Sequence, residues 1–264
     1  MTLQASDGFA FGWNAYSTYL QDDYRVTNRL TLNLGIRWEA ESPRREIRNR
    51  QSDFNLKSLA LDYAGQNGYP ETLHDGNWFN FAPRVGFAYS LTRDSRTVVR
   101  GAYGVFYLTA NTEEGQTNFT TGPWNRTYSF ASLNSGVSFP ITLRNGLPAM
   151  SFNDPFTLSL LTGVAWLPRT YPTGYMQQWN INIQRDIRGT LLQTGYSGTK
   201  GTHLRLTYDL NQVPVNLIGP GESQSRRPYP AVGGITATKS PVGGSTYHAV
   251  QSRFERRLSK GLSF

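Results

Sequence analysis

The side chains that most often perform chemistry are sparse and dispersed in this sequence. Its three histidines, His74, His203 and His248, lie far apart and lack the short spacings typical of zinc ligands. Asp22 and Asp23 are adjacent, but adjacent residues of a strand point to opposite faces, so their carboxyl groups cannot share one catalytic site. No nucleophile can be paired with a base from spacing. The sequence therefore predicts a protein that is not an enzyme and that holds neither a metal nor a cofactor.

A glycine-rich segment at residues 198–202 (GTKGT) contains a lysine, as phosphate-binding loops do. The Walker A spacing is absent, however, and no helix follows the segment. We interpret it as the end of a strand.

The chain is basic, with a net charge of +8 and an isoelectric point of about 9.8. Its cations are scattered, and the one tight basic cluster, residues 44–50 (RREIRNR), has the character of a loop. Nucleic-acid-binding domains gather their cations on one face, so we expect no nucleic-acid partner. Scattered cations fit better with a basic outer surface, or with a basic interior of a channel, that meets anionic lipopolysaccharide or anionic solutes.

Polar and apolar residues alternate without interruption from Arg29 to Glu39. A period of two predicts a β-strand with one apolar face and one polar face. A tilted strand needs about ten residues to cross a bilayer, whereas strands of soluble sheets are commonly about five or six residues long. The length of this strand therefore favours a membrane-spanning sheet.

Strand-like segments occur in pairs joined by short polar turns, and we expect hairpins near 16–39, 81–107, 176–199 and 246–264. Long connections rich in Gly, Pro, Asn, Ser and Thr separate these pairs, at 40–80, 108–175 and 200–245. Bacterial outer-membrane barrels alternate short periplasmic turns with long extracellular loops in this way. We predict an all-β fold, an antiparallel transmembrane β-barrel present as an incomplete set of about eight strands. Parts of the long connections are expected to extend the strands.

The polar faces of these strands are too polar for the core of a sandwich and are candidates for the lining of a lumen. The lumen-facing candidates are Arg37, Glu39, Arg84, Arg100, Gln178, Asn180, Asn182 and Gln184. Strand direction places Arg37 and Arg84 at similar height on strands that we expect to be neighbours. Glu39 is then close enough to pair with one of them, as an ordinary exposed ion pair worth less than about 1 kcal/mol.

Aromatic residues occur near both ends of the predicted strands, where two membrane interfaces are expected. Tyr24 and Tyr89 lie near the short turns, and Trp38, Phe81 and Tyr107 lie near the long connections. These five residues are the candidates for two aromatic girdles.

Several segments resemble barrel hairpins of TonB-dependent receptors, and three of them resemble the Oar-like branch of that family. The receptor-like segments are 19–39, 80–89 and 98–107, and the Oar-like segments are 175–185, 195–204 and 247–264. The resemblance implies a transporter barrel of about 22 strands around a plug domain. It also implies uptake of a large or scarce solute, driven through the TonB energy-coupling complex. No plug, N-terminal domain or signal peptide is recognisable in the sequence, so we expect residues 1–264 to be a partial barrel.

Two alternatives stay open at this point. One is a small, self-contained outer-membrane barrel that acts as an adhesin or pore. The other is a soluble carbohydrate-binding β-sandwich, which would also suit the aromatic content of 13%.

Overall fold

The computed structural model describes residues 2–6, 8–108, 124–129 and 163–256. Within these ranges the secondary structure is β, apart from two short 3₁₀ helices. No helix in the described ranges is long and apolar enough to cross a membrane.

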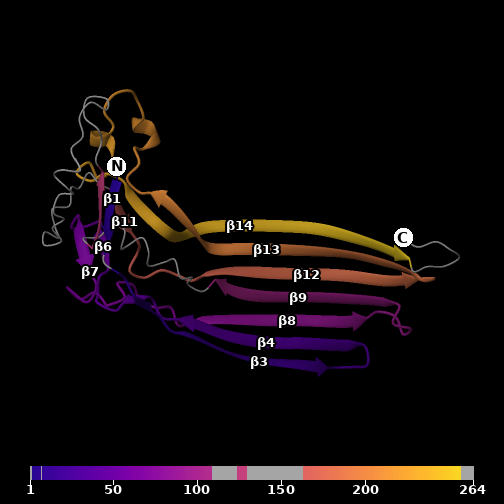
Figure 1. Ribbon diagram of the computed structural model, residues 1–264. Helices are drawn as coiled ribbons and strands as arrows, with labels where there is room; N and C mark the ends of the chain where they lie inside the picture. Colours follow the sequence, from indigo (N-terminus) through magenta and orange to yellow (C-terminus); the bar gives the residue numbers. More distant parts are fainter. Residues whose placement is uncertain (1, 7, 109–123, 130–162, 257–264) are drawn as a thin grey trace.

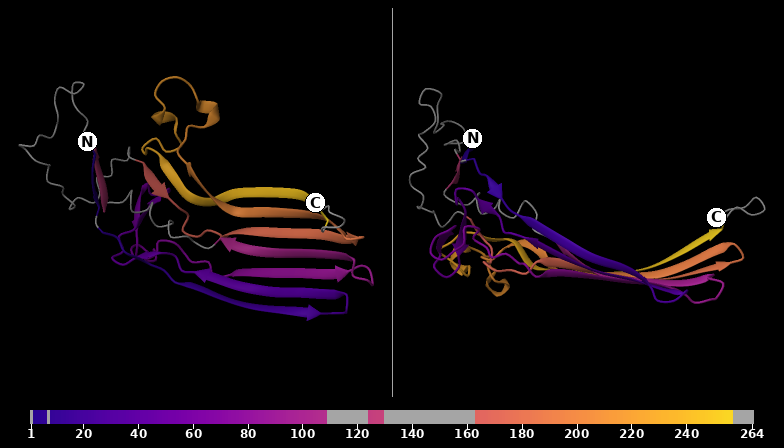
Figure 2. Two further views of the ribbon diagram at one scale, coloured as in Figure 1. Left: turned by 45° about the vertical axis from the view of Figure 1, so that its right-hand side comes forward. Right: turned by 90° about the horizontal axis from the view of Figure 1, so that it is seen from below.

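One large sheet dominates the molecule (Figure 1), with the strand order β11-β14-β13-β12-β9-β8-β4-β3. Its members are β3 (Ala15–Arg25), β4 (Leu30–Glu41), β8 (Asn80–Ser90), β9 (Thr97–Leu108), β11 (Val164–Trp166), β12 (Gly174–Ile187), β13 (Thr190–Asp209) and β14 (Ile235–Arg256). The seven long strands pair antiparallel with their neighbours in chain order. The sheet curves but does not close, so β3 and β11 lie at its two edges (Figure 2).

The eighth strand differs from the one that we predicted. The short strand β11 pairs parallel with the start of β14, and only three residue pairs join them. The run that we expected from Leu262 lies outside the described residues.

The strand β13 extends beyond the predicted hairpin that ends at 199, and β14 begins before the predicted hairpin that starts at 246. Parts of the long connections thus extend these strands, as we expected. They are 20 and 22 residues long, and their pairing continues to Asp209 and Thr236. Register shifts interrupt the ladder beyond Thr202. His203, with a φ of 53°, and Lys239, with a φ of 48°, adopt the left-handed conformation in this irregular part.

The turns at the far end of the sheet are short and locally determined. Between β12 and β13, Arg188 and Gly189 have φ values of 51° and 80°, as a two-residue type I′ turn requires. The Gly189 amide also donates to Asp186 Oδ1 at 3.0 Å. Between β3 and β4, the Thr27 hydroxyl oxygen accepts bonds from the amides of Arg29 and Leu30 at 3.1 and 3.0 Å.

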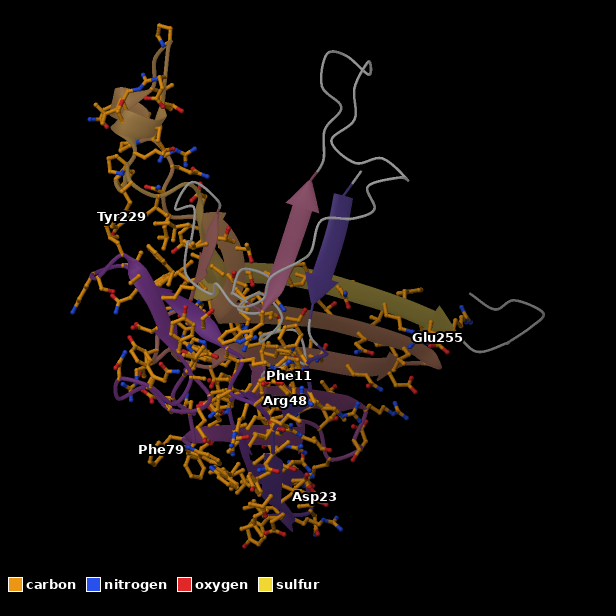
Figure 3. The ribbon with its side chains drawn as sticks, turned by 60° about the vertical axis from the view of Figure 1, so that its left-hand side comes forward. Phe11, Asp23, Arg48, Phe79, Tyr229 and Glu255 are labelled. Carbon is orange, nitrogen blue, oxygen red and sulfur yellow. The ribbon has the colours of Figure 1, made fainter. Side chains whose placement is uncertain are left out.

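The long connections pack together at the opposite end of the sheet (Figure 2), and we call their described residues within 42–79, 163–173 and 210–235 the cap. The smaller elements are β1 (Thr2–Ser6) with β10 (Asn125–Ser129), β2 (Phe11–Gly12) with β5 (Arg45–Glu46), β6 (Ser52–Asn55) with β7 (Ala60–Tyr63), and the 3₁₀ helices η2 (Val215–Leu217) and η3 (Gln224–Arg226). In Figure 3, Tyr229 lies at the cap, and Glu255 lies at the other end of the sheet.

The hydrophobic core lies at the cap end of the molecule, where cap residues pack with β11 and the start of β14, and not against the middle of the large sheet. Phe54, Val164, Val232 and Ile235 form a buried cluster to which all three long connections contribute. The middle of the sheet instead leaves large apolar side chains such as Leu34 and Ile36 exposed, at 43% and 45%.

Candidate functional site

The register of the sheet sorts its side chains into two faces. Residues directly opposite each other in an antiparallel pair point to the same side, so each row across the sheet belongs to one face. One row is polar or small, with Gln21, Gly35, Arg84, Gly104, Gln178 and Thr199. The next row belongs to the opposite face and contains Asp22, Leu34, Val85, Tyr103, Trp179 and Gly198. The predicted alternation is therefore in register across six strands.

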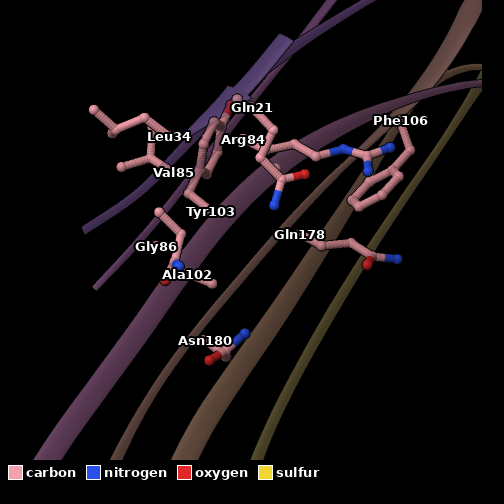
Figure 4. A pocket seen from close by; sticks show the side chains of 13 residues that line it. Gln21, Leu34, Arg84, Val85, Gly86, Ala102, Tyr103, Phe106, Gln178 and Asn180 are labelled. Atoms are coloured by element: carbon pink, nitrogen blue, oxygen red, sulfur yellow. The ribbon is translucent and has the colours of Figure 1, made fainter. Parts of the chain in front are cut away.

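A hollow of about 360 Å³ lies around Arg84 (Figure 4). Its polar-face lining is Gln21, Asn33, Gly35, Arg84, Gly86, Ala102, Gly104, Phe106, Gln178 and Asn180, and Leu34, Val85 and Tyr103 complete it. Small residues thus alternate with amide side chains and one guanidinium group. Such a surface offers hydrogen-bond donors and acceptors to a polar solute, with one fixed positive charge.

Arg84 is positioned by an aromatic ring. Its guanidinium carbon lies 4.9 Å from the centre of the Phe106 ring, which is a cation–π contact. Gly104 makes room for this ring, because a Cβ atom there would lie 3.1 Å from it. The contact holds the guanidinium group at the hollow.

On the polar face, the other lumen candidates lie on either side of the hollow, toward the cap and toward the short turns. Arg37 Nε donates to Glu39 Oε1 at 2.5 Å, so Arg37 and not Arg84 is the partner of Glu39. Strands β4 and β8 are neighbours, as predicted, and Arg84 pairs with Gly35, two residues from Arg37.

Toward the short turns, the polar face carries bonded amide side chains. Arg100 Nη1 donates to Gln184 Oε1 at 3.2 Å, and Asn182 Nδ2 donates to Asn180 Oδ1 at 3.1 Å. The structure therefore brings Arg84, Gln178 and Asn180 together at the hollow and places the remaining candidates along the same face. That these residues line a lumen stays a prediction.

Gln21, Asn33 and Phe106 are among the contributors to the hollow that sequence reasoning did not name as site residues. Asn33 and Gln21 carried a usable signal, because both occupy polar-face positions of their strands. Phe106 carried none, because an aromatic residue at a polar-face position breaks the alternation from which the faces are inferred.

The aromatic candidates lie in rows near the two ends of the apolar face. Trp38 pairs with Phe81 and Tyr107 pairs with Tyr175, a residue that we did not predict. The rings of Tyr107 and Tyr175 are 5.8 Å apart. At the other end, Tyr24 pairs with Leu32 and Tyr89 pairs with Leu30.

The aromatic rows have a separation that suits a membrane. Leu30 and Trp38 mark the two ends on β4. Eight steps of about 3.4 Å give about 27 Å along the strand, and somewhat less across a bilayer when the strand is tilted. The lipid-facing band of an outer-membrane barrel is about 25 Å tall.

The cap is joined by buried polar groups. Both carboxylate oxygens of Asp53 lie 3.2 Å from the Leu167 amide, which donates across two of the long connections. Burial raises the pKa of Asp53 to about 8, although the amides of Leu167 and Phe54 oppose the shift. Burial lowers the pKa of His74 to about 4, and its Nδ1 lies 3.3 Å from the Pro168 carbonyl oxygen.

We expect the stability of the cap to depend on Asp53 as the pH rises. Its pKa in the folded cap exceeds the ordinary value of 3.8, so the folded cap keeps a proton that the opened cap releases. The stabilisation of the folded cap by this proton is greatest below about pH 4 and is lost as the pH rises toward about 8. Asp53→Asn should remove it, with a limiting slope of about 1.4 kcal/mol per pH unit.

Hydrogen exchange of the Leu167 amide, measured for both proteins between pH 5 and 8, checks this expectation. The difference in opening free energy between variant and parent should change steadily with pH in favour of the variant. Taking the difference removes the contribution of His74, which both proteins share. A difference independent of pH would contradict the role of Asp53.

Within the described residues, no group of three or more His, Cys, Asp or Glu side chains is arranged to hold a metal ion. The polar side chains of the hollow and its one stacked guanidinium group support binding of a polar solute.

A family model described as an outer membrane beta barrel domain matches residues 2–264 of this chain. No curated protein matches it significantly. Eight chains of solved structures match, and they include the following three. The first is the FpvAI–pyocin S2 complex, at 11% identity and a TM-score of 0.42, with 97% of this chain and 21% of that chain covered. The second is a double mutant of the Serratia marcescens hemophore receptor HasR in complex with its hemophore HasA and heme. It has 10% sequence identity and a TM-score of 0.44, with 93% of this chain and 32% of that chain covered.

The third is the siderophore receptor PirA from Pseudomonas aeruginosa, at 11% identity and a TM-score of 0.40, with 97% of this chain and 42% of that chain covered. The chain thus spans between 21% and 42% of the length of these three structures.

Proposed function

This chain belongs to the outer membrane β-barrel domain family, and from that premise we propose that its sheet is part of the wall of a TonB-dependent transporter or receptor. The family match confirms the predicted barrel class and the predicted location in the bacterial outer membrane. In the proposal, the polar face lines the lumen, and the intact protein takes up a large or scarce solute.

The observation that carries the proposal is the division of the sheet into two faces, neither of which is covered by a second layer of the described residues. Leu34 and Ile36 are 43% and 45% exposed in the described structure. In a membrane, hydrocarbon would cover these apolar side chains. The opposite face carries Arg84, Gln178 and Asn180, which suit water. A soluble sandwich would bury one face against another sheet, and the described residues contain no such layer.

In the proposal, the solute contacts the hollow. Arg84 presents several N–H donors while its flat face rests on Phe106. The amide side chains of Asn33, Gln178 and Asn180 both donate and accept, so they serve solutes of varied chemistry. In the proposal, a plug domain closes the lumen, and the TonB complex moves it at the expense of the proton gradient of the inner membrane.

Comparison of solutes removed from the medium tests the proposal. Cells that carry the full-length protein should deplete at least one solute that cells without it leave untouched, and a protonophore or loss of TonB should abolish the difference. Arg84→Gln should slow this uptake by at least about tenfold if one charge-assisted hydrogen bond to the solute is lost. Ile183→Ala, on the apolar face and outside the hollow, is the matched control.

Two results would contradict the proposal. One is the absence of any solute whose depletion requires both the protein and the proton gradient. The other is uptake that continues unchanged after the gradient is collapsed.

A further inference from the structure

The hollow around Arg84 meets a second hollow on the same face of the sheet. The second hollow has a volume of about 280 Å³, and both hollows are lined by Gln21, Gly35 and Arg84. From these shared residues the second hollow extends to Tyr19, which is 73% exposed. Arg84 therefore lies where the two hollows join, with the Phe106 ring in the first hollow and the Tyr19 ring in the second.

The positive charge of Arg84 is not neutralised by a carboxylate of the described residues, among which it forms no ion pair. Two carboxylates of the polar face are bonded elsewhere, because Glu39 accepts from Arg37 and Asp23 accepts from Asn33. A guanidinium group binds a carboxylate or a phosphate through two parallel N–H donors. The unpaired cation therefore suits an anionic group of the solute.

The approach to the guanidinium group is open on two sides. Arg84 pairs with Gly35 on one neighbouring strand and with Gly104 on the other, so no side chain flanks it there. Figure 4 shows the guanidinium group beside the Phe106 ring, 4.9 Å from the ring centre. The ring orients the guanidinium group, and the two glycines leave space for an anion.

The other polar groups of the first hollow are amides, which suit hydroxyl groups. Gln21 and Gln178 lie in the row of Arg84, and Asn33 and Asn180 lie in the adjacent row of the polar face. An amide side chain both donates and accepts, and so does a hydroxyl group. Four neutral amides around one cation therefore match a solute that has several hydroxyl groups and one negative charge.

The two exposed rings favour a sugar over other hydroxylated solutes. Phe106 is 37% exposed, and Tyr19 is more exposed still. The face of a sugar ring carries C–H groups that pack on an aromatic ring, while its edge carries hydroxyl groups. A sugar thus matches the rings and the amides together. An acid without hydroxyl groups would displace water from the amides without replacing its hydrogen bonds.

We infer that the solute of the hollow is a sugar that carries an anionic group, either a carboxylate or a phosphate. The anionic group binds to Arg84, the hydroxyl groups bond to the surrounding amides, and the sugar ring packs on an aromatic ring of the hollows. The inference names the solute class of the proposed function and rests on it, because the polar face must line a lumen that the solute enters.

Binding of four probes to the full-length protein in nanodiscs tests this inference. Galacturonic acid, galactose 6-phosphate and galactose share their ring hydroxyl groups and differ in the group at carbon 6. Cyclohexanecarboxylate has a carboxylate on a ring without hydroxyl groups. At least one of the two anionic sugars should bind about tenfold more tightly than galactose and than cyclohexanecarboxylate. The anionic sugar that binds more tightly identifies the anionic group.

Arg84→Gln should weaken binding of the preferred anionic sugar about tenfold and leave binding of galactose unchanged, because only the anion uses the charge. Arg25→Gln is the matched control, since it removes the same charge from the same face. Arg25 lies four residues from Gln21 on β3, which is about 14 Å along the strand. This variant should keep the preference of the parent.

Four outcomes would overturn the inference. They are equal binding of galactose and the anionic sugars, binding of cyclohexanecarboxylate as tight as that of the anionic sugars, equal weakening of galactose and the anionic sugar by Arg84→Gln, and equal effects of Arg84→Gln and Arg25→Gln.

Cysteine labelling separates such a failure from failure of the proposed function. Residues 1–264 contain no cysteine, so Asn182→Cys and Ile181→Cys report the two faces in a full-length protein otherwise free of cysteine. If a hydrophilic thiol reagent modifies position 182 and spares position 181 while the sugar preference is absent, the solute class alone is wrong. If the reagent does not prefer position 182, the proposed function is wrong and the solute class falls with it. Selective labelling together with the preference that depends on Arg84 supports both.

Discussion

Replacement of Leu34 by arginine is expected to lower the free energy of unfolding of the intact barrel in lipid by about 2–4 kcal/mol. Leu34 lies in the middle of the apolar face, between Asp22 and Val85 in its row, and its side chain is 43% exposed. An arginine there would place its charge in hydrocarbon near the bilayer midplane. Urea unfolding of the full-length protein in lipid vesicles measures the loss.

The adjacent residue supplies the matched control. Asn33 points to the polar face, where its Nδ2 donates to Asp23 Oδ1 at 2.6 Å. Asn33→Arg should cost much less than Leu34→Arg, because the new cation would meet water instead of hydrocarbon. A carboxylate lies opposite each position, Asp23 opposite Asn33 and Asp22 opposite Leu34, so the neighbouring charge is matched. Leu34→Ala separates the loss of the apolar side chain from the effect of the added charge. Equal losses for the two arginine variants would remove the assignment of the faces.

The regular strands could be predicted because one local rule governs them. The period of two places a strand at 29–39, and β4 runs from Leu30 to Glu41. The same rule fails for the outer part of β13 and β14, because register shifts beyond Thr202 break the period. It also misses β11, whose three residues are too few to show any period.

The polar face of the candidate site could be predicted, but the hollow within it could not. Arg84 and Gln178 follow from alternation along their own strands. The hollow depends on which residues meet across strands, as when Gly104 pairs with Arg84 and with Gln178. A glycine has no side chain to assign to a face, so its role as the floor of a hollow emerges only from the register.

The position of the core explains how the two ends of the molecule differ. Membrane-facing and lumen-facing surfaces need no buried layer, so the sheet is stabilised by strand pairing and by its surroundings. The long connections lack that support. They gather their apolar residues, among them Phe54 and Val232, into a core with β11 and the first residue of β14.

This division predicts that the cap can be loosened while the sheet stays intact. Phe54 is 2% exposed and packs in the cluster with Val164, Val232 and Ile235. Phe54→Ala should lower the free energy of opening of the cap by about 3–5 kcal/mol, the usual range for truncation of a buried phenylalanine. The Val164 amide, which donates to the Gly234 carbonyl at 2.9 Å, reports cap opening by hydrogen exchange.

Amides of the ladder between β9 and β12 report the sheet in the same experiment and should keep their protection. Val215→Ala is the matched control, because Val215 lies in the cap but is 86% exposed and contributes nothing to the core. If Phe54→Ala accelerated exchange equally in the cap and in the ladder, the two regions would unfold as one unit. The core of the cap would then stabilise the strands of the large sheet as well as the cap.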